Sequence, residues 1–187
     1  MRAGNNCGNA VLTASGFSGS LLWSNGATTS SITVTTGGTY TVTQTVSGCT
    51  SVAGTGIAAP LPNLAAPSVA VANNCGSSVL TASGFTGSLL WNNGATTPSI
   101  TVTTGGTYTV TQTASGCTSA AGSNTAAPKT IPSAPNVAVV NNCGNSILTA
   151  SGFSGSLLWS NGSTTTSITV ATAGTYTVTQ MVNGCMS

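Results

Sequence analysis

The chain is almost without ionisable side chains. Its 187 residues include no aspartate, glutamate or histidine, and Arg2 and Lys129 are the only cations. Two cations this far apart in the sequence cannot form the basic patch that attracts nucleic acids or anionic membranes. General acid–base catalysis needs a carboxylate, an imidazole or a tuned lysine, and no base is available to activate a serine or threonine. We therefore expect no enzyme activity, no cofactor, no bound metal and no nucleic-acid partner.

Long hydrophobic runs are also missing, although the mean hydropathy is +0.31. Threonine, serine, glycine and asparagine interrupt every apolar stretch before it reaches the roughly 18 residues that a membrane-spanning helix needs. We therefore expect no membrane insertion, and hydroxyl and amide groups must provide the hydration that charge usually provides. No apolar signal region follows Met1 and Arg2, so we interpret Met1 as a trimmed start, or the chain as an excerpt of a longer one.

What the chain does contain is a threefold repeat. The segments LTASGF, GSLLW and TYTVTQ occur unchanged in every copy, and six of the seven prolines lie between the copies. The motif NNCG recurs at equal intervals, starting at Asn5, Asn73 and Asn141. These copies are called the first, second and third sequence repeats. We predict three domains, at residues 1–58, 66–126 and 134–187, joined by Pro-rich linkers at residues 59–65 and 127–133.

Short alternating segments within each repeat predict β-strands. In the first repeat they are residues 10–15, 20–23 and 30–36, followed by TYTVTQT at residues 39–45. Gly-rich turns separate them, no 3.6-residue apolar period is present, and strong helix formers are scarce. Many short strands with such turns favour an all-β tandem array of three small β-sandwiches.

The predicted array has edge strands that are not equivalent in the three repeats. VAVA at 69–72 and VAVV at 137–140 predict opening strands, whereas the first repeat starts without such a segment. Residues 52–58 and 120–126 could supply a closing strand that the third repeat lacks. If the chain is the whole protein, we therefore expect open sheet edges at both ends. Either the chain is a segment of a longer array, or neighbouring chains in a filament cover these edges by strand addition.

Six cysteines fall two to a repeat, with the same spacing each time: Cys7 and Cys49, Cys75 and Cys117, and Cys143 and Cys185. They permit 15 pairings, of which repeat symmetry leaves two sets. Pairing within each repeat uses all six; pairing across the linkers, Cys49–Cys75 and Cys117–Cys143, leaves two unpaired. We favour one disulfide within each repeat, because this set leaves no cysteine unpaired. A zinc site is not expected, because zinc would need more ligands than the two thiols of a repeat provide. Structural disulfides imply an oxidising, extracytoplasmic compartment.

Residues 21–50, LLWSNGATTSSITVTTGGTYTVTQTVSGCT, carry a family resemblance. They are similar to the immunoglobulin-like and PKD-like repeats of large secreted surface proteins of Bacteroidota, and the similarity extends over all three repeats. The resemblance implies immunoglobulin-like sandwiches, export commonly through the type IX route, a bacterial cell-surface location, and roles in adhesins and surface filaments. It also implies a core role for Trp23 and a tyrosine-corner role for Tyr40.

Two groups of residues are candidates for contacts between repeats or subunits. Gln44, Gln112 and Gln180 replace an apolar residue of the family pattern, and each could bond its own domain's backbone or join two domains. Phe17, Phe85 and Phe153 lie in a Gly/Ser turn, where each could pack under its own domain or contact a neighbour. The aspartate usual in the family is missing, so calcium sites between domains are not expected.

These observations predict a structural extracellular repeat protein, forming a cell-surface fibre or an adhesin stalk that associates with neighbouring repeats or subunits. An alternative is a module that binds surface glycans through exposed aromatic side chains. A remote alternative is an ice-binding surface built from the threonines that line one face of residues 39–45; threonine is also simply a suitable uncharged residue for an exposed strand face.

Overall fold

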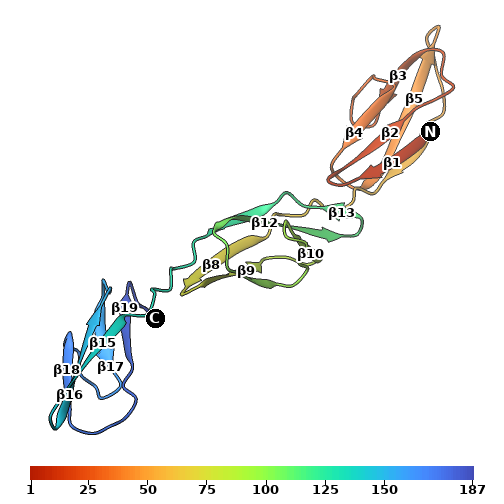
Figure 1. Ribbon diagram of the computed structural model, residues 1–187. Coiled ribbons are helices and arrows are strands. Elements are labelled where there is room, and N and C mark those ends of the chain that lie inside the picture. Colours follow the sequence, from red (N-terminus) through yellow and green to blue (C-terminus); the bar gives the residue numbers. More distant parts are fainter. The chain divides into compact units, whose positions relative to one another are not determined.

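The computed structural model describes all 187 residues, Met1–Ser187, as strands joined by turns and loops, with no helix (Figure 1). The chain divides into two compact units, and the boundaries between them fall within the second sequence repeat. The first unit comprises residues 1–68, 84–96 and 110–122, and the second residues 69–83, 97–109 and 123–187. No segment forms a helix that is long and apolar enough to cross a membrane.

The first repeat forms two antiparallel sheets. One has the order β1-β2-β4, and the other has the order β3-β5-β6, with β7 also paired to β5. Because Val42 of β5 pairs with both Trp23 of β3 and Gly54 of β7, β3 and β7 lie on opposite edges of β5. The strands are β1 (Arg2–Asn6), β2 (Asn9–Thr13), β3 (Ser20–Trp23), β4 (Ser31–Val34), β5 (Gly38–Val46), β6 (Cys49–Thr50) and β7 (Gly54–Ala58).

Alternate side chains of both sheets meet in one core, as the period of two in each strand requires. Leu12 and Ile32 come from the first sheet, and Trp23 and Val42 come from the second. The indole Nε1 of Trp23 donates a hydrogen bond to a backbone carbonyl 2.8 Å away, and Tyr40 packs against the cluster. The predicted core position of Trp23 is therefore confirmed, and the shared core holds the two sheets of this repeat together.

The second repeat has the same strand pattern. Its sheets have the orders β8-β9-β11 and β10-β12-β13, with β14 paired to β12. The strands are β8 (Ser68–Asn74), β9 (Ser77–Ser83), β10 (Ser88–Trp91), β11 (Ser99–Val102), β12 (Gly106–Ala114), β13 (Cys117–Thr118) and β14 (Gly122–Ala126). Leu80, Trp91 and Val110 are each at most 1% exposed. The apolar positions that alternate in the sequence are thus buried here too.

The third repeat differs in its longest strand. β19 begins at Val178, whereas β5 and β12 begin four residues earlier in the repeat, at Gly38 and Gly106. In the first two repeats β7 and β14 pair with this strand, but no strand pairs with residues 174–177. The third repeat comprises β15 (Asn136–Asn142), β16 (Asn145–Ser151), β17 (Ser156–Trp159), β18 (Ser167–Val170), β19 (Val178–Val182) and β20 (Cys185–Met186), in sheets β15-β16-β18 and β17-β19-β20.

One expectation about the sheet edges is wrong. Arg2–Asn6 forms β1, which pairs with β2 along its whole length, so the first repeat does have an opening strand. All five residues of β1 are exposed, so the strand has no apolar side chains in the core. The tight turn after Asn6 and the backbone hydrogen bonds pair it with β2 instead, which is why the apolar pattern does not predict it. The possible closing strands are confirmed as β7 and β14.

Candidate functional site: the junctions between repeats

Both cysteines of a repeat lie at tight hairpin turns. Cys7 and Gly8 are the two residues that connect β1 to β2, and Gly8 has a positive φ of 78°. Cys49 directly follows the turn formed by Ser47 and Gly48, whose φ values are 48° and 83°. Two consecutive positive φ values are typical of the turn that best matches the twist of a hairpin. The turns therefore hold each thiol at a fixed place at the end of a hairpin.

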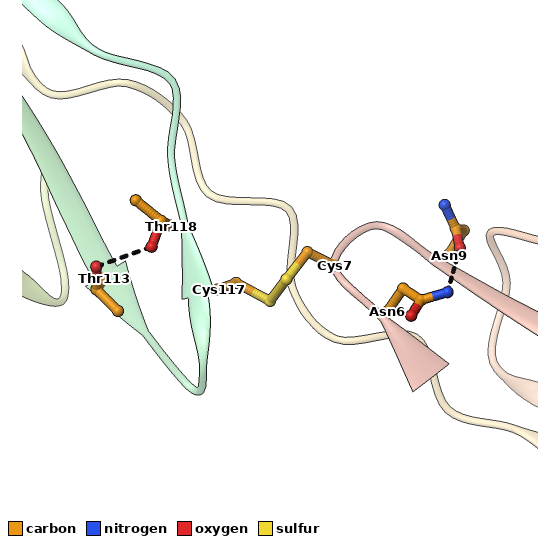
Figure 2. The surroundings of a disulfide bond; sticks show 6 residues. All are labelled: Asn6, Cys7, Asn9, Thr113, Cys117 and Thr118. Carbon is orange, nitrogen blue, oxygen red and sulfur yellow. Dashed lines mark hydrogen bonds between the residues drawn. A yellow bond between two sulfur atoms is a disulfide. The ribbon is translucent and has the colours of Figure 1, made fainter. Parts of the chain in front are cut away.

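The disulfides join different repeats, and Figure 2 shows the one between Cys7 and Cys117. Cys7 is bonded to Cys117, with an S–S distance of 2.05 Å and a Cα–Cα distance of 5.7 Å. Cys75 is bonded to Cys185, so each bond joins the first cysteine of one repeat to the second cysteine of the next. Both pairings considered from the sequence, within a repeat and between adjacent cysteines across a linker, are wrong. The expectation that all six cysteines are bonded is also wrong, because two are free: Cys49 and Cys143.

The strand arrangement of the first repeat explains why it does not close on itself. Two backbone hydrogen bonds of 2.9 Å hold Leu61 beside Cys7, and Leu61 follows soon after Ala58, which pairs with Gly38 at the start of β5. Cys49 lies at the other end of β5. The nine residues of β5 span about 26 Å at about 3.3 Å per residue, whereas a disulfide needs Cα atoms roughly 6 Å apart. One repeat therefore presents its two thiols at opposite ends.

The NNCG motif fastens the start of the following linker. The side chain of Asn5 accepts a hydrogen bond of 3.0 Å from the backbone N–H of Ala59. The side chain of Asn73, at the equivalent position of the second repeat, accepts the corresponding bond from Ala127 N–H, also at 3.0 Å. Backbone hydrogen bonds then pair the turn of the second repeat with Lys129, as they pair the equivalent turn in the first repeat with its linker. In the first two repeats the asparagine of the NNCG motif therefore binds the start of the linker, and its cysteine forms the disulfide.

Gln112 fastens the end of the linker. Its Oε1 accepts hydrogen bonds from the backbone N–H groups of Thr86 and Gly87, at 2.8 and 3.3 Å, within its own repeat. Its Nε2 donates to the carbonyl oxygen of Ala65 in the linker, at 2.7 Å. The side chain is only 3% exposed. Glutamine thus bonds the backbone of its own repeat and of the linker that precedes it, because its amide accepts and donates where valine could do neither. The alternative, that it joins two domains, stays a prediction.

Of the two remaining glutamines, Gln180 repeats the bonds of Gln112, whereas Gln44 does not. Gln180 is 2% exposed, accepts from two backbone N–H groups of its own repeat, and donates to the carbonyl of Ser133 at 2.6 Å. Gln44 is only half-buried, and its Oε1 accepts from the backbone N–H of Ser18 at 3.1 Å. Gln44 lines a pocket of about 310 Å³ in the first repeat. The first repeat thus has a cavity beside the glutamine that contacts a linker in the other two.

Gly54 and Gly122, at equivalent positions of the first two repeats, show what occupies the position of the Gln44 pocket in the second repeat. A Cβ atom added to Gly122 would overlap the carbonyl oxygen of Pro67, a buried residue directly before β8. A Cβ atom added to Gly54, at the equivalent position of the first repeat, would have its nearest neighbour 3.8 Å away. Gly54 also lines the pocket. The close approach of Pro67 to Gly122 therefore has no counterpart at Gly54.

The aromatic candidates separate into two groups. Trp23, Trp91 and Trp159 are at most 2% exposed, so none of them offers a flat surface to a ligand. Phe153 packs against the core of its own repeat and is half-buried, as is Phe85. Phe17 is 40% exposed and lines the Gln44 pocket. Sequence reasoning identified Phe17 and Gln44 as contact candidates but could not place them beside one pocket.

No family model matches the chain, and no curated protein matches it. The two disulfides indicate a non-reducing environment.

Proposed function

We propose that the protein is a structural extracellular repeat protein, a fibre or adhesin stalk at a bacterial cell surface. In this proposal its repeats are immunoglobulin-like sandwiches related to the surface-protein repeats that residues 21–50 resemble. The observation that carries the proposal is the connection of each repeat to the next by a disulfide. A bond within a domain would stabilise that domain alone, whereas these bonds hold successive repeats together.

The disulfides bypass the linkers, which would otherwise be the extensible parts of the chain. Residues 59–67 connect β7 to β8 and could span about 30 Å if they were fully extended. The bond between Cys7 and Cys117 keeps the two Cα atoms 5.7 Å apart whatever the linker does. Tension between the first two repeats is therefore carried by a covalent bond, which suits a load-bearing stalk.

The surface is also suited to an exposed extracellular fibre. Arg2 and Lys129 are the only residues at which trypsin-like proteases could cut. The long strands present threonine on the face opposite the core, and paired hydroxyls such as those of Thr45 and Thr50, 3.1 Å apart, cross-link neighbouring strands. These features support a durable spacer and need no dedicated ligand.

The proposal is tested by negative-stain imaging of the native protein at the cell surface and after purification. We expect elongated particles that self-associate end to end and whose connectivity changes on reduction. Compact particles that never elongate or associate would contradict the fibre. The matched control is a Cys117→Ser variant, which lacks one inter-repeat bond and should show wider variation in the distance between two successive repeats.

A second function, glycan or surface binding, is favoured by one observation, the exposed ring of Phe17 at the Gln44 pocket. Binding on a glycan array that is lost in a folded Phe17→Ala variant would support it. The matched control is Phe153→Ala, because Phe153 packs against its own core. If the wild-type protein binds no glycan on the array, the glycan-binding function is contradicted and the stalk function remains.

A further inference from the structure

Two cysteines, Cys49 and Cys143, are free and exposed. Their counterparts in the other repeats are all bonded according to one rule: the first cysteine of a repeat pairs with the second cysteine of the next. For Cys143, a first cysteine, the rule requires a second cysteine of another repeat. For Cys49, a second cysteine, it requires a first cysteine of another repeat. The two free thiols are therefore complementary to each other.

We propose that two copies of this chain join head to tail through a disulfide between Cys143 of one copy and Cys49 of the other. If the spacing of the repeats runs on from the first copy into the second, Cys49 of the second lies 110 positions after Cys143 of the first. This is the separation of both existing disulfides. The inference rests on the proposed fibre function and names a second copy of the chain as its partner.

The free thiols are held in the same local geometry as the bonded ones. Cys143 and Gly144 connect β15 to β16 as Cys7 and Gly8 connect β1 to β2, and the two glycines have φ values of 84° and 78°. The turn before Cys49 has φ values of 48° and 83°, and the equivalent turn of the second repeat has 51° and 78°. No rearrangement of either hairpin is needed for the bond to form.

The exposed fractions of the cysteines and glutamines show that the Cys49 end of the first repeat lacks the covering found at the equivalent ends of the other two repeats. Cys117 and Cys185, the bonded second cysteines, are at most 1% exposed, whereas Cys49 is exposed. Gln44, on the same strand as the Cys49 turn, is likewise less buried than its two counterparts. The pocket beside Gln44 is a second, independent sign that this end of the first repeat is an acceptor surface. Cys49, Gln44 and Gly54 are thus less covered than the equivalent residues of the second repeat.

The bond is formed by oxidation of two thiols. Each thiol loses one proton and one electron, and a small-molecule disulfide such as oxidised glutathione accepts both electrons and protons to give two small thiols. The reaction proceeds by exchange: the thiolate of one copy forms a mixed disulfide with the small molecule, and the second copy's thiolate displaces it. The existing Cys7–Cys117 and Cys75–Cys185 bonds are not consumed.

The test uses two variants, Cys49→Ser and Cys143→Ser, in a glutathione redox buffer. We expect each variant alone to remain monomeric on non-reducing gels, and an equimolar mixture to give a dimer of twice the 18.0 kDa chain mass. The wild-type protein should give a ladder, with a Cys49–Cys143 peptide found by mass spectrometry after peptic digestion. Homodimers of either variant in amounts equal to the mixed dimer, or no cross-linking at all, would overturn the inference.

Imaging the same samples separates this inference from the fibre function. Filaments without the Cys49–Cys143 peptide would overturn the head-to-tail bond and leave the fibre intact. Covalent dimers that never elongate further or appear at the cell surface would leave the bond intact and contradict the fibre.

The pocket carries a second inference of its own: we infer that it binds an extended peptide of the type small residue–Ala–Pro. Ala65–Pro67 and Ser133–Pro135 have this sequence, both prolines are buried, and both first residues accept a hydrogen bond from a glutamine equivalent to Gln44. The ligand's first carbonyl would accept from Gln44 Nε2, and its proline would lie against Gly54. Such a peptide is intrinsically extended because of its proline.

A synthetic peptide with the sequence of residues 60–68, PLPNLAAPS, tests this inference by NMR titration of the full chain. We expect saturable shifts around Gln44 and Phe17, and binding at least tenfold weaker when Gly54→Ala places a methyl group where the proline carbonyl should lie. A peptide with glycine in place of Pro67 is the matched ligand control. No saturable binding, or equal binding by the Gly54→Ala variant, would overturn the inference.

Discussion

The disulfide connectivity predicts how far the protein can be stretched, and this can be measured on single molecules held at their two termini. When the chain is fully unfolded but oxidised, the shortest path runs from Met1 to Cys7, across to Cys117, back along the chain to Cys75, and across to Cys185. The path contains the residues before Cys7, those between Cys75 and Cys117, and those after Cys185. About 50 residues at about 3.6 Å each give a maximum extension of about 180 Å.

Removing the bonds should lengthen the molecule in steps. With Cys185→Ser only the Cys7–Cys117 bond remains, and the path of about 76 residues allows about 270 Å. Full reduction frees all 187 residues, which allows about 670 Å. The assay is force spectroscopy with handles on both termini, with and without a phosphine reductant.

A different oxidised length would contradict the inter-repeat bonds. Pairing within each repeat would leave about 60 residues on the path and give about 215 Å in the oxidised protein. An extension of that length, or one that Cys185→Ser does not change, is incompatible with the connectivity described above. The shortest covalent path passes through residues 75–117 of the second repeat and bypasses the chain between Cys7 and Cys75 and between Cys117 and Cys185. The cores of the first and third repeats should therefore carry no force at full extension. A variant that destabilises the core of either should leave the final oxidised length unchanged.

Three further predictions concern the linker contacts and the thiols. Gln112→Val should lower the free energy of unfolding by about 1–3 kcal/mol, because three part-buried hydrogen bonds to backbone N–H and carbonyl groups are lost, whereas Gln44→Val should cost less. Urea denaturation compares the two variants. Gly122→Ala should cost about 1–3 kcal/mol because its methyl group overlaps the carbonyl of Pro67, while Gly54→Ala should change stability by less than about 0.5 kcal/mol; a large effect at Gly54 would contradict the open pocket. Native alkylation without reductant should label the two free cysteines alone, and mass spectrometry showing any other labelled cysteine would contradict the disulfides.

Much of the strand pattern can be predicted from the sequence, because burial in a strand repeats every two residues. SLLW at residues 20–23 is β3, and Ile32 and Val34 alternate into the core as expected. β1 cannot be predicted this way, because RAGNN has no apolar alternation and pairs through its backbone alone. The closing strands are recognisable only as possible strands, since their pairing partner lies on a distant part of the chain.

The site can be predicted only as a set of residues. Gln112 is anomalous in the sequence because an amide occupies a core-facing position, and its two roles follow from having both an acceptor and a donor. Which linker carbonyl it meets depends on how residues 59–67 fold back onto β12, and the sequence contains no local signal for that. The pocket beside Gln44 cannot be predicted, because the strand pattern does not show that residues 65–67 pack against Gln112 and Gly122 in the second repeat.

Composition, turn chemistry and local periodicity are enough to establish that the protein is all-β, that it consists of equally spaced repeats, and that its cysteines are in register with them. Which thiols meet depends instead on the folded strands. The spacing of the two cysteines in a repeat is compatible with closure of that repeat, but β5 places the two hairpin turns about 26 Å apart, so each thiol can reach only a neighbouring repeat. The length of one strand excludes closure within a repeat, and the pairing that forms differs from both sets that repeat symmetry suggests from the sequence.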